Sequence, residues 1–135
     1  MHSLKRIAGT AAAALALAAG GIALAPAASA ATPQSCSTQD GGILCGKRTA
    51  GLGYLSVQGS FLNQSSTIKH IAFTPGCGNG SQGLVWAFKG SISVLPGQTA
   101  RSTFYGSVPA GFTNYTCSVT LHDTDTGKTY STARF

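Results

Sequence analysis

Four cysteines constrain the fold of this 135-residue chain more than any other feature of its sequence. They are Cys36, Cys45, Cys77 and Cys117. An even number of cysteines in a small exported domain predicts disulfide bonds. Three pairings are possible, and the closeness of the first two cysteines around a Gly-Gly turn favours Cys36–Cys45 together with Cys77–Cys117. On the loop-entropy account, bridges over loops of these lengths contribute about 3 and about 4 kcal/mol to stability.

The N-terminal segment has the three parts of a secretory signal peptide. Lys5 and Arg6 supply positive charge, residues 7–25 carry no charge, and Ala28-Ser29-Ala30 provides small residues for a signal peptidase. We therefore expect a signal peptide over residues 1–30 and cleavage between Ala30 and Ala31. The alternative is a permanent membrane anchor, but alanine and glycine make the segment only mildly apolar. The mature protein is then secreted and has no membrane attachment.

The remaining residues, 31–135, have a composition that favours strands over helices. They contain no glutamate, many Gly, Ser and Thr residues, and all the aromatic residues of the chain. Seven Lys and Arg residues against three Asp residues give this part a net charge of +4. Short segments with a period of two recur between turn residues, without a helical pattern among them. This predicts an all-β fold, a single antiparallel β-sandwich of about seven strands.

The pattern divides the mature chain into two parts. We expect a leader and a disulfide-tied loop over residues 31–53, with a short strand at Ile43–Cys45, and the sandwich itself over residues 54–135. Its clearest strands carry inward residues at alternate positions. These are Leu55, Val57 and Phe61 in one strand, Ile71 and Phe73 in a second, and Cys117, Val119 and Leu121 in a third. Residues 75–83 are rich in Pro and Gly, so we expect an exposed loop that contains Cys77.

Several segments in the second part resemble bacterial immunoglobulin-like modules. Tyr115-Thr116-Cys117 is similar to a tyrosine corner, in which a tyrosine lies two residues before a cysteine. Gly59 to Asn63, together with the later Pro96-Gly97, is similar to strand ends and entries of such modules. The alanine-rich signal also resembles those of high-GC actinomycetes. The resemblance covers residues 54–135 and implies an immunoglobulin-like architecture, which by itself carries no function.

Motifs that would indicate catalysis or cofactor binding fail on their context. Residues 78–83 spell G-x-G-x-x-G, but a strand pattern follows instead of the helix that a dinucleotide needs. Asp125-Thr126-Gly127 matches the aspartic protease triplet, yet it lies in a polar hairpin turn beside a lysine. The mature chain has two histidines, His70 and His122, and no C-x-x-C pair. We therefore expect no enzyme activity, no cofactor and no metal site.

A binding or structural role is the function that these exclusions favour. Trp86, Tyr105 and Asn79 are the binding candidates, the first two as an exposed aromatic strip with Phe88. Burial of Trp86 and Phe88 in the core is the alternative. The expected partner of this monomer is an extracellular protein or a cell-wall polymer, because the spread positive charge does not form a nucleic-acid footprint. The alternative function is a secreted hydrolase inhibitor, since small disulfide-bonded β proteins of this kind resemble the amylase and protease inhibitors of actinomycetes.

Overall fold

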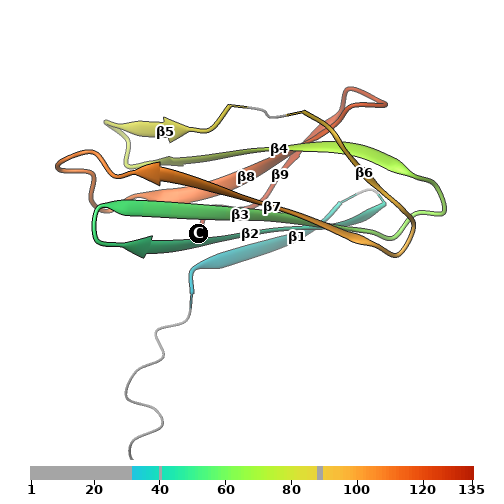
Figure 1. The fold of residues 1–135 in the computed structure, drawn as a ribbon, viewed down its shortest axis with the longest axis horizontal. Helices are drawn as coiled ribbons and strands as arrows, with labels where there is room; N and C mark the ends of the chain where they lie inside the picture. Colours follow the sequence, from blue (N-terminus) through green and yellow to red (C-terminus); the bar gives the residue numbers. More distant parts are fainter. Residues whose placement is uncertain (1–31, 40, 88–89) are drawn as a thin grey trace, which may run out of the picture. The chain divides into compact units, whose positions relative to one another are not determined.

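Two antiparallel β-sheets pack face to face in the computed structural model, which describes residues 32–39, 41–87 and 90–135 (Figure 1). The first sheet has the order β1-β2-β3-β7, with β1 at Gln34–Gln39, β2 at Gly42–Gly51, β3 at Tyr54–Asn63 and β7 at Thr99–Ser107. The second has the order β5-β4-β8-β9, with β5 at Gly83–Val85, β4 at Lys69–Gly78, β8 at Thr116–Asp123 and β9 at Thr129–Ser131. The strand β6 (Ile92–Val94) pairs with β4. The expected all-β sandwich is confirmed, and the expected signal peptide with its Ala30–Ala31 cleavage site lies outside the described residues.

The described residues form nine strands, not about seven, because residues 34–51 belong to the sheet. The expected leader and loop over residues 31–53 is therefore wrong: β1 pairs with β2 along its whole length, and β2 pairs with β3. Residues from Thr32 onward form one compact unit with the rest of the sandwich. The sequence of β2 does not show a clear alternation of apolar and polar residues, because its core-facing positions include Gly42, Gly46 and Arg48 as well as Leu44.

Cys77 lies in a strand and not in the expected loop, because β4 continues through Pro75 to Gly78. Proline usually argues against a central strand, since it has no N–H to donate. Here Pro75 is opposed to β8 on one edge of β4. On the other edge, it lies between the short segments of β4 that pair with β6 and with β5. Its carbonyl accepts a hydrogen bond from the backbone N–H of Trp86 beyond β5. The nitrogen of Pro75, which carries no hydrogen, therefore lies on the β5 and β6 edge, where the pairing of β4 is already interrupted.

Both expected disulfides are confirmed, and each joins directly opposed residues of neighbouring strands. Cys36–Cys45 links β1 to β2, and Cys77–Cys117 links β4 to β8. The first bridge reaches solvent, whereas Cys77 and Cys117 are 5% and 0% exposed and belong to the core. The second bridge therefore acts as a core side chain as well as a cross-link.

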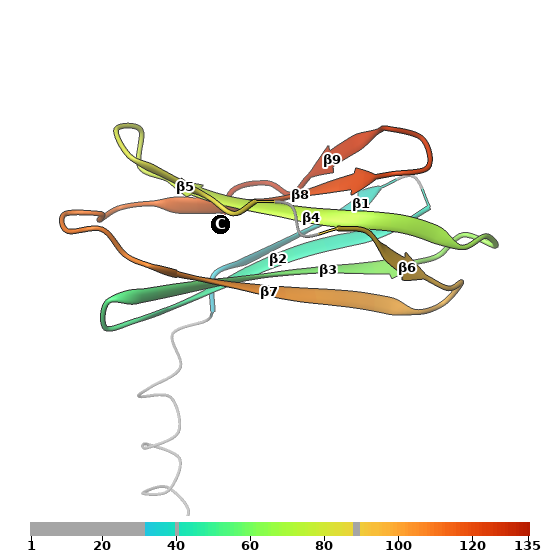
Figure 2. The same ribbon diagram turned by 45° about the horizontal axis from the view of Figure 1, so that its top comes forward.

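Alternate residues of the long strands fill the space between the two sheets, which Figure 2 shows as two layers with β3 and β7 in one and β4 and β8 in the other. The expected inward residues are all buried. With the other large members they form one cluster: Leu44, Leu55, Val57, Phe61, Ile71, Phe73, Val94, Phe104, Phe112, Val119 and Leu121. Burying a side chain of this size contributes about 2 kcal/mol, so the cluster supplies the main driving force for folding.

Two glycines in the core-facing rows of β2 and β3 allow the sheets to approach. Gly46 and Gly59 are directly opposed in the register. A Cβ atom on Gly59 would lie 2.8 Å from the ring of Phe73, and one on Gly46 would lie 2.6 Å from the ring of Phe135. The absence of side chains at this pair leaves room for aromatic rings from the opposite side of the core.

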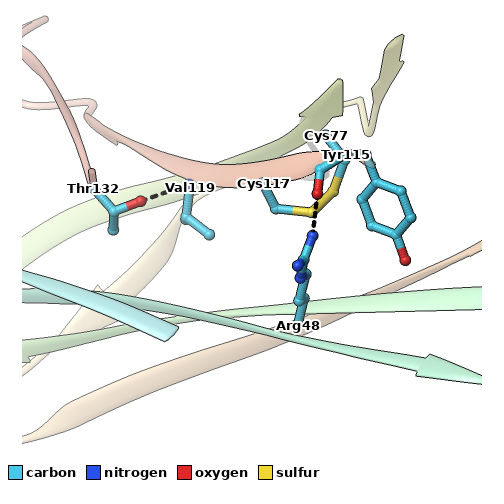
Figure 3. The surroundings of a disulfide bond; sticks show 6 residues. All are labelled: Arg48, Cys77, Tyr115, Cys117, Val119 and Thr132. Carbon is cyan, nitrogen blue, oxygen red and sulfur yellow. Dashed lines mark hydrogen bonds between the residues drawn. A yellow bond between two sulfur atoms is a disulfide. The ribbon is translucent and has the colours of Figure 1, made fainter. Parts of the chain in front are cut away.

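Arg48 connects the two sheets near the start of β8 (Figure 3). Its guanidinium donates a hydrogen bond to the backbone carbonyl of Tyr115 and lies 4.8 Å from the centre of the Tyr115 ring. Tyr115 in turn stacks on Phe112, with 4.7 Å between the ring centres. The segment that resembles a tyrosine corner is thus held by a cation–π contact and a charge-assisted hydrogen bond from the other sheet.

Asn63 organises the turn between β3 and β4 from a fully buried position. Its side-chain amide donates to the carbonyls of Thr67 and Val94, at 2.8 Å each, and its side-chain oxygen accepts from the backbone N–H of Ser65 at 3.0 Å. One side chain therefore holds the turn and attaches it to the end of β6. Because the contacts are buried or partly buried, each lost partner leaves a polar group without its bond.

We expect the substitution Asn63→Ala to lower the free energy of unfolding by about 3 kcal/mol, because it leaves two backbone carbonyls and one N–H without their hydrogen-bond partner. The neighbouring exposed residue provides the control: Gln64→Ala should change stability by less than about 0.5 kcal/mol. Urea unfolding of both variants measures the difference. A loss below about 1 kcal/mol for Asn63→Ala would show that the turn does not depend on this side chain.

Candidate functional site

The outer face of the β1-β2-β3-β7 sheet presents polar side chains in rows set by the strand register. Directly opposed residues on neighbouring antiparallel strands point to the same face. Lys47 is opposed to Gln58, and Ser60 is opposed to Arg101. Their neighbours in sequence Val57 and Gly59 face the core, so these four side chains point outward.

A hollow of about 230 Å³ lies on this face. Its lining includes both ends of the exposed disulfide, one glycine, two cations and three uncharged polar residues. These are Cys36, Cys45, Gly46, Lys47, Arg101, Gln34, Gln58 and Ser60. The side-chain amide of Gln58 also donates to the hydroxyl of Thr103 on β7 at 3.1 Å, which orients it across the sheet. We call this outer face, from Gln34 to Tyr105 across the four strands, the polar face.

The two cations of the polar face are not neutralised by a described carboxylate. Within residues 32–39, 41–87 and 90–135, the ion pairs are Lys69–Asp123 and His70–Asp125, both on the second sheet. Lys47 and Arg101 are exposed. Hydrogen bonding across strands of up to ten residues holds the backbone beneath them. The polar face therefore combines positive charge with fixed geometry.

Two tyrosines lie at the end of the polar face away from Arg101. Tyr105 is 71% exposed and Tyr54 is 48% exposed. Ser56 is opposed to Tyr105, and Tyr54 lies two positions before Ser56, so the two rings are diagonal neighbours on one face. The expected exposure of Tyr105 is confirmed, and Tyr54 is a candidate that the sequence analysis did not select.

Trp86 is a structural neighbour of Tyr105 and not a fellow member of an exposed strip. Its indole N–H donates to the backbone carbonyl of Tyr105 at 2.9 Å, and its ring is half-buried against the core. It also covers Gly106, where a Cβ atom would lie 3.0 Å from the ring. Trp86 thus occupies part of the unpaired edge of β7, and its burial agrees with the core alternative; Phe88 lies outside the described residues.

Asn79 has its polar atoms engaged in the turn between β4 and β5. Its side-chain oxygen accepts from the backbone N–H groups of Ser81 and Gln82, at 3.1 and 2.8 Å. Its amide donates to the carbonyl of Thr113 at 3.2 Å, which connects two loops at this end of the sandwich. These contacts assign Asn79 a role in turn geometry.

A second depression, of about 580 Å³, lies on the outer side of the five-stranded sheet. Its lining includes Thr74, Val85, Trp86 and His122. The imidazole Nε2 of His122 lies 2.9 Å from the hydroxyl of Thr74, a base beside a hydroxyl group. The adjacent Asp123 cannot orient that imidazole, because its carboxylate points to the opposite side of β8.

The carboxylates of Asp123 and Asp125 both hold the β8–β9 hairpin. Asp123 accepts from the backbone N–H groups of Asp125 and Thr126 and lies 3.7 Å from the ammonium of Lys69. Asp125 lies 2.9 Å from the imidazole Nδ1 of His70. This hydrogen bond from His70 is the main reason that the pKa of Asp125 lies below its ordinary value of 3.8. The triplet at residues 125–127 is a turn, as expected, and Gly127 has a positive φ of 74°.

No protein-family model matches the chain, and no curated protein matches its sequence. Among the residues that the structure describes, no three His, Cys, Asp or Glu side chains gather into a set that could hold a metal ion. The described part of the chain also contains no helix long and apolar enough to cross a membrane. The two disulfides indicate an oxidising, extracellular type of environment.

We expect the carboxyl group of Asp125 to titrate below pH 3.8 and to return toward 3.8 in His70→Ala. Since the folded-state pKa is lowered, the contribution of this carboxylate to stability is present above the unfolded value and is lost as the pH falls through the folded value. Carbon-detected NMR of the carboxyl group measures both values. The control is His122→Ala, which should leave Asp125 unchanged; an equal effect of both substitutions would remove His70 as the cause.

Proposed function

We propose that the protein is a secreted, non-catalytic binding module that attaches to a component of the cell envelope through the polar face. Residues 1–30 act as the signal for export. The two disulfides support this location, because they form and persist in oxidising compartments. On this account the sandwich is a rigid support, and the outward side chains of its first sheet carry the function.

An immunoglobulin-like architecture is part of this proposal, and the strand order supports it. In immunoglobulin domains, strands A, B and E share one sheet and strands C, F and G share the other. The strands β2, β3 and β7 have the first arrangement, and β4, β8 and β9 have the second. The disulfides differ from that family, because each joins two strands of the same sheet. The likeness is one of architecture and carries no function.

The observation that carries the proposal is the hollow on the polar face with its two unneutralised cations. A surface that only covers the core needs no recess and no exposed tyrosine pair. The titratable groups of the β8–β9 hairpin, in contrast, are engaged in turn geometry. The exposed cations and tyrosines of the polar face therefore support a role in recognition.

A secreted hydrolase inhibitor remains the second candidate, on one specific observation. The disulfide Cys77–Cys117 lies at the base of the turn at residues 79–82, and Asn79 bonds that turn to the loop at Thr113. Exposed loops that are ordered before binding lose less entropy in a complex. Stoichiometric inhibition of amylases or proteases by the purified protein would favour this candidate over envelope binding.

The proposed function predicts that the oxidised mature protein sediments with isolated envelopes of its host. The substitution Ser60→Tyr introduces a large ring at a residue that lines the hollow. It should lower the bound fraction about tenfold, because a blocked contact surface loses about 1.4 kcal/mol of binding. The matched control is Thr120→Tyr, at a half-buried outward position of β8, which should retain binding. Melting curves verify that both variants are folded.

Two results would contradict this function. The first is the absence of sedimentation with the wild-type protein. The second is equal binding by the wild type and Ser60→Tyr, which would place any contact elsewhere on the molecule.

A further inference from the structure

Lys47 and Arg101 stand on opposite sides of the hollow, with an uncharged strand between them. Gln58 and Ser60 of β3 separate the two cations across the sheet. Two strand spacings of about 4.8 Å and an offset of two residues place the Cα atoms of the cations roughly 12 Å apart. This spacing is compatible with two successive anionic groups of a polymer, one at each cation.

The surface between and beside the cations suits sugar units. Gln58 and Ser60 offer an amide and a hydroxyl group that can donate and accept hydrogen bonds. Tyr54 and Tyr105 provide exposed aromatic rings with polar hydroxyl groups at the same face. Amphipathic rings of this kind can cover the apolar side of a sugar ring while the amide and hydroxyl groups bind its edges.

The charge distribution favours an anionic ligand at this face. Of the three acidic residues in the chain, Asp123 and Asp125 lie on the β8–β9 hairpin of the other sheet, and Asp40 lies outside the described residues. Arg101 can bind a phosphate or carboxylate group through two parallel hydrogen bonds, and Lys47 can serve as a compact point charge. The face is thus complementary in charge to an acidic polysaccharide.

We infer that the polar face binds an anionic polysaccharide, with Lys47 and Arg101 engaging successive acidic groups and Tyr105 contacting a sugar ring. This inference rests on the proposed envelope-binding function and names its ligand class. A nucleic acid is the less suitable ligand, because its binding depends mainly on the neutralisation of many phosphate groups by cations. Two cations neutralise only two anionic groups, so contacts with the sugar units must supply the rest of the binding free energy.

The test compares the binding of dextran sulfate with that of unsubstituted dextran, which has the same sugar backbone. The double variant Lys47→Gln/Arg101→Gln should bind dextran sulfate about tenfold less tightly than wild type at 50 mM salt. For this variant, the slope of log affinity against log salt concentration should become less steep by about 1.5, since each released counterion contributes about 0.7 to 0.9 to the slope. Unsubstituted dextran should bind weakly to both proteins.

A charge-matched control separates a site from general attraction. Lys128→Gln/Arg134→Gln removes the same charge from two exposed residues outside the polar face and should retain at least half of the affinity. Tyr105→Ala tests the sugar contact: it should weaken binding while leaving the salt slope unchanged. All three variants change exposed side chains, and melting curves verify their folding.

The outcomes distinguish this inference from the proposed function. Equal losses in the two double variants would overturn it in favour of general charge attraction. Tighter binding of a single-stranded oligonucleotide, lost in Lys47→Gln/Arg101→Gln, would replace the polysaccharide by a nucleic acid. If dextran sulfate does not bind but envelope sedimentation persists and is sensitive to Ser60→Tyr, the ligand class is wrong and the envelope-binding function stands. If the protein neither binds dextran sulfate nor sediments with envelopes, both the inference and the proposed function are wrong.

Discussion

The covalent link between Cys77 and Cys117 is the constraint on which the rest of the sandwich depends. It joins the two central strands of the second sheet, β4 and β8, at directly opposed positions. Both sulfur atoms belong to the buried cluster, so the bridge fixes the register of the sheet and also fills core volume. The pairing of β8 with β9 and the contact of Phe135 above Gly46 are built on this register. On the loop-entropy account a bridge over this separation contributes about 4 kcal/mol, a large share of the stability of a small domain.

Sequence periodicity predicted the strands whose inward rows contain several large apolar residues, and it predicted less of the strand whose inward row does not. Leu55, Val57 and Phe61 revealed β3 because side chains on alternate positions of a strand share a face. The strand β2 was predicted only at Ile43–Cys45. The rest of its inward row carries glycine and Arg48, and their roles depend on contacts with Phe135 and Tyr115, which are far away in the sequence. The composition of a single strand cannot reveal such contacts.

The candidate site was predictable only in part, for the same reason. Tyr105 could be selected as an exposed aromatic residue, but Lys47, Gln58 and Arg101 come from three strands whose neighbourhood is set by pairing across the sheet. Trp86 was selected by residue type, and its role changed once its indole N–H was found to bond to the edge of β7. The hairpin carboxylates lie on the second sheet, and Lys47 and Arg101 lie on the first.

Differential reduction of the two disulfides tests the central claim most directly. Native protein is treated with dithiothreitol, the released thiols are alkylated at intervals, and the labelled peptides are quantified by mass spectrometry. The account predicts early labelling of Cys36 and Cys45, which reach solvent, and protection of Cys77 and Cys117 until the domain unfolds. Labelling of all four cysteines at one rate while the native fold persists would contradict a core that is locked by the second bridge.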